Sequence, residues 1–524
     1  MGTLVVGTAI GCPLGVGACA LWTGEARADE PRRATEPRIF SEPGEVTNVV
    51  DAFDEGNPFD IHVTLGFQQS FLGGKIRRES SIRQDTLATG NFISPLMNVA
   101  SYKEVTSRLN TRIDIGLFRD IAVYARLPLI LNQSRELTDL AGSSKVQGVV
   151  LQGGPGEQLF SLPYKSPDRS GIEYLAAGFD FSIFNQYRDP SKPTWLFGFE
   201  GRFNVSEPMH ACGKAGKGLN QGSQQVDCAD PSDIDRDGKS TNDDASRPGL
   251  TRDEQGRSVE GTFSGGRKAG VSRGVTAVEV HTIVSRRIKY IEPYGGFRAM
   301  FEFPTASSDF GRTDVSNVVV RRPPIQGWFT LGTQVIPYEL REKFQRLTFD
   351  FRFTGTYRSE GRDYSPLFDA IGASDAPSIR RPAYASYMGG KTSGEGTQSL
   401  VDPTSQKIFT TGLTDVGAHG GFTLSTSAMF QAGEYIKFQV GGAYSIFQNH
   451  FLTGDQPCDS SAKNDVGKSG PCQSISPNAQ GGFNHSATGQ PNPLYRAAID
   501  AVGRRFKLDD ATQLDLWINA IVMF

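Results

Sequence analysis

Four aspartates in a Gly- and Asp-rich stretch have the spacing of oxygen ligands for a cation. Asp233, Asp235 and Asp237 occupy alternate positions, Gly238 follows directly, and Asp244 completes the set. Ca²⁺ prefers hard oxygen ligands, and a glycine permits the sharp turn that brings them together. The spacing predicts a weak calcium site that orders a loop. A solvated acidic loop without metal is the alternative, because Asp244 stands where calcium loops usually carry a bidentate Glu.

The cysteines form two close pairs outside the N-terminal stretch. Cys212 lies near Cys228, and Cys458 lies near Cys472, each pair within one polar segment, while the other two of the six cysteines fall within residues 1–28. Local disulfides in an oxidising compartment account for this spacing. Four free thiols are the alternative. A zinc site is disfavoured, because no His stands at ligand spacing from either pair.

Charged residues recur at every second position of segments whose other positions are apolar, as in residues 347–354. Because side chains alternate between the two faces of a strand, these charges share one face. The charged residues expected to line the interior of a barrel are Arg108, Arg112, Asp114, Arg126, Asp180, Glu200, Arg202, Glu292, Arg298, Asp350, Arg352 and Lys437. Two interpretations stay open: ion pairs that fill a narrow barrel, or a hydrated pathway that selects polar solutes.

Three histidines, His62, His281 and His419, fall on the same inward phase, where hydrogen-bonded interior residues are expected more often than proton-transfer groups. Barrel-shaped phospholipases and lipid A deacylases carry a close His-x-Ser pair on the lipid face. Glycines follow His419, and His485 next to Ser486 lies in a long polar segment, so that pattern is not met. The sequence therefore does not predict an enzyme. A net charge of -3 likewise indicates no nucleic-acid partner.

The elements that would position these residues are short segments in which polar and apolar residues alternate. Strands are predicted at 59–71, 105–117, 121–132, 172–185, 195–205, 271–285, 290–303, 325–340, 347–358, 412–430, 435–447 and 513–524. Short links at 118–120, 189–193, 286–288, 341–343 and 432–434 alternate with long polar loops. A soluble barrel or sandwich has no reason to sort its loops in this way, whereas outer-membrane barrels do.

The last strand alternates apolar with mostly polar residues and ends on Phe524. This ending resembles the terminal strand of a bacterial outer-membrane β-barrel. The resemblance implies an all-β fold, a transmembrane antiparallel up-and-down barrel of about twelve strands with short periplasmic turns and long extracellular loops. It also implies outer-membrane lipids, lipopolysaccharide and the barrel-assembly machinery as partners. An even strand count would leave Phe524 at the periplasmic rim.

The chain is expected to divide into three regions. A signal peptide is predicted at 1–28, because this stretch is mostly uncharged and apolar and ends in a small-x-small cleavage pattern, and a lipoprotein with Cys19 modified is the alternative. A periplasmic leader is predicted at 29–57 and the barrel at 58–524. Long external loops are expected at 73–103, 133–170, 206–270, 304–324, 359–409 and 452–510; they are either mobile or folded over the mouth.

The function favoured by the sequence is a passive channel or transporter for a small solute in the outer membrane. A surface-exposed binding or structural barrel, which displays disulfide-stapled and calcium-ordered loops, is the alternative. A membrane lipid hydrolase is a third and weaker interpretation. Apart from Ca²⁺, no cofactor is expected.

Overall fold

The computed structural model describes the chain in fifteen stretches. They are residues 46–47, 49–50, 52, 60–79, 96–140, 158–214, 226–228, 268–310, 322–374, 376–380, 410–454, 473–477, 483–487, 494–500 and 503–524. The chain divides into two units, Met1–Arg38 and Ile39–Phe524, and every described residue belongs to the second. The predicted signal peptide lies outside the described residues. No helix in these stretches is long and apolar enough to cross a membrane.

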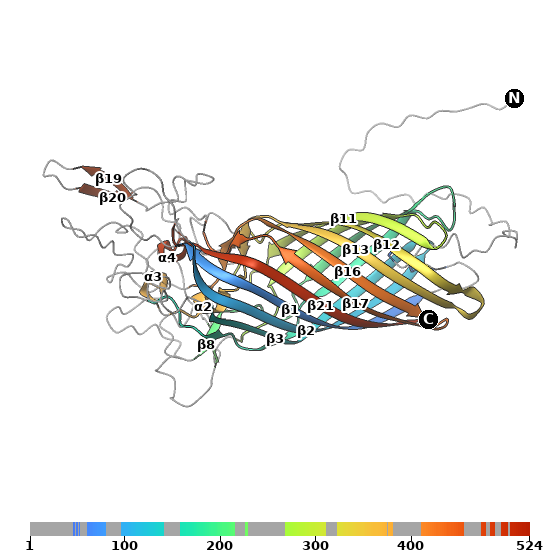
Figure 1. Ribbon diagram of the computed structural model, residues 1–524, viewed down its shortest axis with the longest axis horizontal. Coiled ribbons are helices and arrows are strands. Elements are labelled where there is room, and N and C mark those ends of the chain that lie inside the picture. Colours follow the sequence, from blue (N-terminus) through green and yellow to red (C-terminus); the bar gives the residue numbers. More distant parts are fainter. Residues whose placement is uncertain are drawn as a thin grey trace, which may run out of the picture. The chain divides into compact units, whose positions relative to one another are not determined.

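Twelve antiparallel strands close into one barrel (Figure 1). In order around the barrel they are β1 (Ile61–Glu79), β2 (Leu96–Phe118), β3 (Ile121–Asp139), β6 (Leu175–Phe184), β7 (Thr194–Phe203), β10 (Val275–Ser285), β11 (Ile291–Pro304), β12 (Gln326–Leu340), β13 (Gln345–Arg358), β16 (His419–Gln431), β17 (Ile436–Phe447) and β21 (Phe506–Met523). The first and last strands pair along their length, and the Phe524 amide donates to the Ile61 carbonyl at 2.9 Å. The predicted closed, twelve-stranded fold is confirmed.

The outer face of the barrel is apolar. On β13, Phe351 is 51% exposed whereas Thr348 on the opposite face is 3% exposed, and Phe297 and Leu424 extend the same outer surface on other strands. Exposure of so continuous an apolar surface to water is unfavourable, whereas its contact with the hydrocarbon of a bilayer is favourable. A closed barrel also leaves no backbone group unpaired in the bilayer. The protein is therefore a bacterial outer-membrane β-barrel, as its last strand predicted.

The short connections all lie at one end of the barrel, here called the turn end; the opposite end is the loop end. They comprise residues 119–120, 185–193, 286–290, 341–344 (which includes the 3₁₀ turn Arg341–Lys343) and 432–435. Asp120, Lys289 and Phe344 adopt positive φ values of 60°, 54° and 51°. This left-handed conformation reverses the chain within a few residues. The predicted alternation of short and long links is confirmed for the strands described.

Four strands run further toward the loop end than the sequence predicted. β1 continues to Glu79, β2 begins at Leu96, β3 continues to Asp139 and β21 begins at Phe506, so parts of the predicted loops 73–103, 133–170 and 452–510 are strand. β2 has 23 residues, whereas about 9 to 11 suffice to cross a bilayer. These extensions were not predicted, because the pattern is reversed there: on β1 the apolar Ile76 faces inward, whereas Lys75 is exposed on the outer face.

Short elements from the long loops occupy the loop end. They are β4 (Tyr164–Lys165), β5 (Arg169–Ile172), β8 (Cys212–Lys214), β9 (Val226–Cys228), β14 (Gly361–Asp363), α2 (Phe368–Gly372), α3 (Pro377–Arg380), β15 (Thr414–Val416), β18 (His450–Phe451), β19 (Gln473–Pro477), β20 (Phe483–Ala487) and α4 (Ala497–Asp500). We call β14, α2, α3 and α4 the cap. Leu367, Ile371 and Ile379 from the cap region pack with Ile76 of β1 and Phe506 of β21, all at most 1% exposed. Burial of each such side chain contributes about 1.5 to 3 kcal/mol, which explains why this part of the loops is folded.

Candidate functional site

Charged side chains from six neighbouring strands meet on the inner face of the barrel, in groups that bridge the strands. In the first group, an Nη atom of Arg112 lies 2.6 Å from Asp114 and 3.3 Å from Asp180. The other oxygen of Asp180 lies 2.9 Å from Nε2 of His281. This contact passes over Gly198, where a Cβ atom would come within 2.2 Å of both side chains. A glycine is therefore required for Asp180 and His281 to meet.

The second group contains three arginines and two glutamates. Glu200 lies 2.5 Å from Arg126 and 2.7 Å from Arg202, and Arg202 also hydrogen-bonds Glu279. Arg298 is 3.8 Å from Glu279. The arginines stabilise the two carboxylates against the cost of burial. This group has one more arginine than carboxylates, and the first group has the opposite balance, with Asp114 and Asp180 around the single Arg112.

The third group joins two strands further around the wall. Asp350 accepts hydrogen bonds from Arg352 at 3.0 Å and from the Tyr294 hydroxyl at 2.6 Å, and Arg352 also donates to the Tyr294 oxygen at 2.9 Å. Elsewhere in the barrel, Arg108 lies 3.1 Å from Glu173. The structure thus brings most of the predicted interior charges together as ion pairs.

Inward-facing aromatic rings support the arginines. The Arg112 guanidinium lies 3.9 Å from the centre of the Tyr124 ring, and Arg298 lies 4.3 Å from the centre of the Trp328 ring. Tyr124 covers Gly178 of the neighbouring strand so closely that a Cβ atom there would lie 2.5 Å from the ring. Such rings lie flat on the wall instead of crossing the lumen. These aromatic residues were not predicted from the sequence; an inward-phase aromatic residue near a strand glycine is the signal that points to them.

The arginine side chains remain partly accessible although they point into a closed barrel. The exposed fraction of the side chain is 43% for Arg298, 39% for Arg352 and 34% for Arg112. Neighbouring side chains would reduce these values if they filled the barrel at this level. The lumen therefore contains space that water can occupy next to the arginines.

The opposite half of the wall is mostly uncharged. Thr423 and Ser445 are joined at 2.8 Å, Gln439 donates to Ser427 at 3.1 Å, and Asn519 donates to Gln439 at 2.8 Å. Hydroxyl and amide groups form this side, on β16, β17 and β21. The predicted lumenal Lys437 also lies on β17 and is buried. The inner surface is consequently asymmetric, with its ion pairs concentrated on one side.

Ion pairs fasten the cap to the loop end of the barrel. Arg169 lies 2.6 Å from Asp369 of α2, and both side chains are at most 3% exposed. Asp363 of β14 lies 2.8 Å from both Arg273 and Arg358. Burial opposes ionisation of Asp363, but these two arginines outweigh it and hold its pKa below the ordinary value. The charged cap residues were not identified from the sequence, because no periodic pattern marks them.

One of the two predicted disulfides is present and contacts the cap. Cys212 and Cys228 are bonded, and they face each other in the β8–β9 pair. The Cys212 amide donates to Asp369 at 2.9 Å, so the disulfide-bonded hairpin holds the acidic partner of Arg169. The predicted pair of Cys458 and Cys472 lies outside the described residues.

At the turn end, part of the N-terminal leader is buried against the wall. The Thr47 hydroxyl lies 2.7 Å from that of Ser285 and 3.3 Å from Glu292, a predicted lumenal residue. Thr47 and Ala52 are each 1% exposed. Thr47, within the predicted leader, therefore packs against inward-facing residues of β10 and β11.

The predicted calcium ligands Asp233, Asp235, Asp237 and Asp244 lie outside the described residues, so calcium binding stays a prediction. In the part of the chain that is described, no group of three His, Cys, Asp or Glu side chains could hold a metal ion. Among the predicted inward histidines, His281 binds Asp180 and His419 stacks on His450 with ring centres 3.7 Å apart.

Comparison with known proteins gives similarity to solved structures only. No protein-family model matches the chain, and no curated protein does. An outer-membrane channel of Pseudomonas putida F1 is 8% identical and aligns over 92% of this chain and 99% of its own, with a TM-score of 0.33. A FadL homologue of Pseudomonas aeruginosa (9% identity, 88% and 90%, TM-score 0.29) and the outer-membrane protease OmpT of Escherichia coli (9% identity, 89% and 96%, TM-score 0.24) are also similar. At this level of similarity, function has to be argued from the chain's own residues.

Proposed function

We propose that this protein is a gated channel that lets a small polar solute cross the outer membrane through the lumen of its barrel. The observation that carries the proposal is the accessibility of Arg298, Arg352 and Arg112, whose side chains are 34 to 43% exposed inside a closed barrel. A wall of paired charges facing such a space favours polar over apolar solutes. The cap at one end and the leader at the other are the parts that would open and close the path.

Adjacent residues on one strand provide a direct test of passage through the lumen. Thr330 and Leu331 follow each other on β12; the Thr330 hydroxyl lies 3.4 Å from that of the inward-facing Thr354, whereas Leu331 is 56% exposed on the outer face. A bulky, charged thiol reagent added from water should lower the single-channel current of Thr330→Cys in planar bilayers. The current of Leu331→Cys should not change, because its thiol faces lipid.

The unsubstituted protein, treated with the same reagent, serves as the baseline. Conductance should be recorded before and after reduction of the Cys212–Cys228 disulfide, because that bond holds the cap. The channel proposal fails if no current appears in either state, or if the reagent reduces the current of both cysteine variants equally.

A further inference from the structure

We propose that Arg298 and Trp328 form an anion subsite in the lumen that binds the carboxylate group of a monoanionic organic solute. The inference rests on the proposed channel function, because it names the class of solute for the same lumen. Three observations support it: the weak pairing of Arg298, the engagement of the nearby carboxylates by other arginines, and the position of the Trp328 ring.

Arg298 is the least paired of the lumenal arginines. Its only described ion pair is the 3.8 Å contact with Glu279, and within the described chain no hydrogen bond engages its guanidinium. By contrast, Arg126 lies 2.5 Å from Glu200, and Arg352 has hydrogen bonds of 3.0 and 2.9 Å. Arg298 nevertheless has the largest exposed side-chain fraction of the arginines discussed above, at 43%. Its donors are therefore available to a solute.

The carboxylates near Arg298 are already engaged. Glu279 hydrogen-bonds Arg202, and Glu200 binds both Arg202 and Arg126. Neither of these carboxylates makes a hydrogen bond with Arg298. A bound anion would supply the charge-assisted hydrogen bonds that the Arg298 guanidinium lacks.

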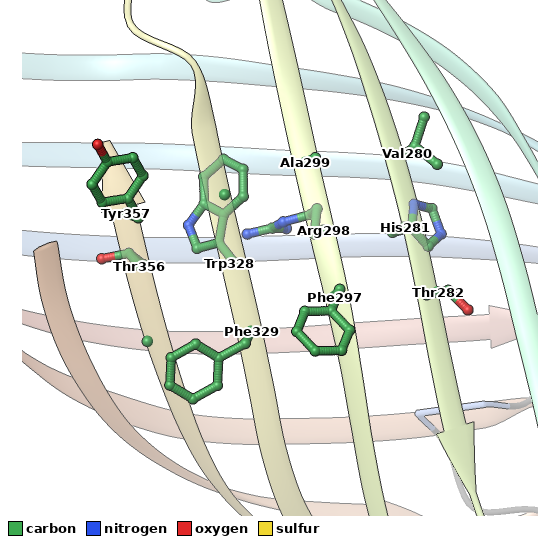
Figure 2. A pocket seen from close by; sticks show the side chains of 12 residues that line it. Val280, His281, Thr282, Phe297, Arg298, Ala299, Trp328, Phe329, Thr356 and Tyr357 are labelled. Atoms are coloured by element: carbon green, nitrogen blue, oxygen red, sulfur yellow. The ribbon is translucent and has the colours of Figure 1, made fainter. Parts of the chain in front are cut away.

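The aromatic ring fixes the orientation of the guanidinium. Arg298 lies opposite Trp328 in the β11–β12 ladder, and Figure 2 shows its side chain reaching toward that ring. With the ring against one face of the planar group, the N–H donors point outward in its plane, where a carboxylate can accept two of them. The Trp328 indole N–H has no hydrogen bond among the described residues and offers a further donor.

The inward row around Arg298 crosses four strands. His281, Arg298, Trp328 and Thr356 lie side by side on β10, β11, β12 and β13. They also contribute to the lining of a pocket of about 470 Å³ (Figure 2), whose other lining residues, such as the exposed Phe297, are on the outward phase. Space beside Arg298 on the lumenal side follows from the 43% exposed fraction of its own side chain.

The carboxylates next to Arg298 select the class of anion. A monoanion brings one negative charge beside Glu200 and Glu279, whereas a dianion such as inorganic phosphate would bring a second. Like charges brought together in this way weaken binding. A planar carboxylate also matches the edge of a guanidinium, which donates two parallel hydrogen bonds to it.

Calorimetric titration of the folded barrel in detergent micelles with benzoate tests the subsite without requiring conduction. Arg298→Gln removes the charge and the donor edge, and should weaken benzoate binding about tenfold or more. Arg298→Lys keeps the charge near Glu279 but lacks the planar group, so it should fold normally and bind with an intermediate loss. Arg286→Gln is the matched control, because Arg286 is an exposed arginine in the turn between β10 and β11, at the turn end of the barrel.

The subsite is ruled out if Arg298→Gln binds benzoate as the unsubstituted protein does, or if Arg286→Gln loses as much affinity. Phosphate titrated at pH 8 should show no dependence on Arg298; equal dependence would overturn the assignment to monocarboxylates. The channel and the subsite can fail separately. Benzoate binding without any conductance would overturn the channel, whereas conductance with no Arg298-dependent binding would overturn the subsite alone.

Discussion

Gly198 of β7 lies under the contact between Asp180 of β6 and His281 of β10. The residue type at this one position decides whether these two side chains can meet across β7. A Cβ atom at Gly198 would lie 2.2 Å from the Asp180 oxygen and from Nε2 of His281. Asp180 cannot move away without disturbing its ion pair with Arg112, and a shift of His281 would break its contact with Asp180. At the residue scale, the lumenal network therefore depends on the absence of a side chain.

We expect Gly198→Ala to lower the free energy of unfolding by about 1 to 3 kcal/mol, the usual cost of adding a methyl group to a packed site. Gly327→Ala is the matched control, because a Cβ atom there meets nothing within 4 Å. Both substitutions lower the conformational entropy of the unfolded chain by the same amount, so this effect cancels in the comparison. Urea titration of folding into lipid vesicles measures the difference. If the two variants have the same stability, the close contact at Gly198 does not constrain the network.

At the element scale, α4 of the cap contains a carboxyl group that couples the cap to pH. Asp500 is buried, and burial raises its pKa to about 7, although Arg362 and Arg496 oppose the shift. In the unfolded chain an Asp has a pKa of about 3.9. Since the folded pKa is the higher of the two, the group's stabilising contribution is complete below pH 4 and is lost as the pH rises through 7.

The cap should therefore open more readily at pH 8 than at pH 5. Hydrogen exchange of α2 and α4, measured on the folded barrel at both pH values, reports this opening. Asp500→Asn cannot ionise and should reduce the difference between the two pH values. Asp363 does not interfere, because its pKa is held below the ordinary Asp value, outside this range. An unchanged pH effect in Asp500→Asn would assign the effect to another group.

Some of the strands and helices could be predicted from the sequence and others could not. β16 and β17 were predicted because lipid selects apolar residues on one face while the lumen accepts polar ones. The loop-end parts of β1 and β21 were not predicted, because the pattern is reversed there: Ile76 and Phe506 face inward against the cap, and the outer surface carries the exposed Lys75–Asp510 ion pair. Helices as short as Phe368–Gly372 are too brief for a 3.6-residue period to be recognised.

The candidate site was predictable as a set of inward charges but not as a set of contacts. Alternation placed Arg126 and Glu200 on the inner face, yet their 2.5 Å contact depends on the registers of β3, β6 and β7, which a single strand's sequence does not specify. Arg298 illustrates the same limit. Arg298 is weakly paired because Glu279 hydrogen-bonds Arg202 on a neighbouring strand instead, and this contact depends on the strand registers.

At the scale of the whole molecule, both ends of the lumen are occupied. The cap packs its apolar residues against the inner face at the loop end. At the turn end, Thr47 and Ala52 are buried, and Thr47 contacts Ser285 and Glu292. The accessible arginines lie on the strands between these two closures. We therefore expect a conducting state to require movement at both ends.

Removal of residues 39–57 should raise the single-channel conductance, because it eliminates the closure at the turn end and leaves every barrel strand intact. Thr47→Val should have a smaller effect in the same direction: it loses both hydrogen bonds, while Ser285 and Glu292 keep the 2.5 Å hydrogen bond between them. The Thr330→Cys labelling experiment, repeated on the shortened protein, separates a wider path from a damaged barrel. If current rises but stays sensitive to the reagent, the leader closes the lumen; unchanged conductance would mean that the leader lies beside the path rather than in it.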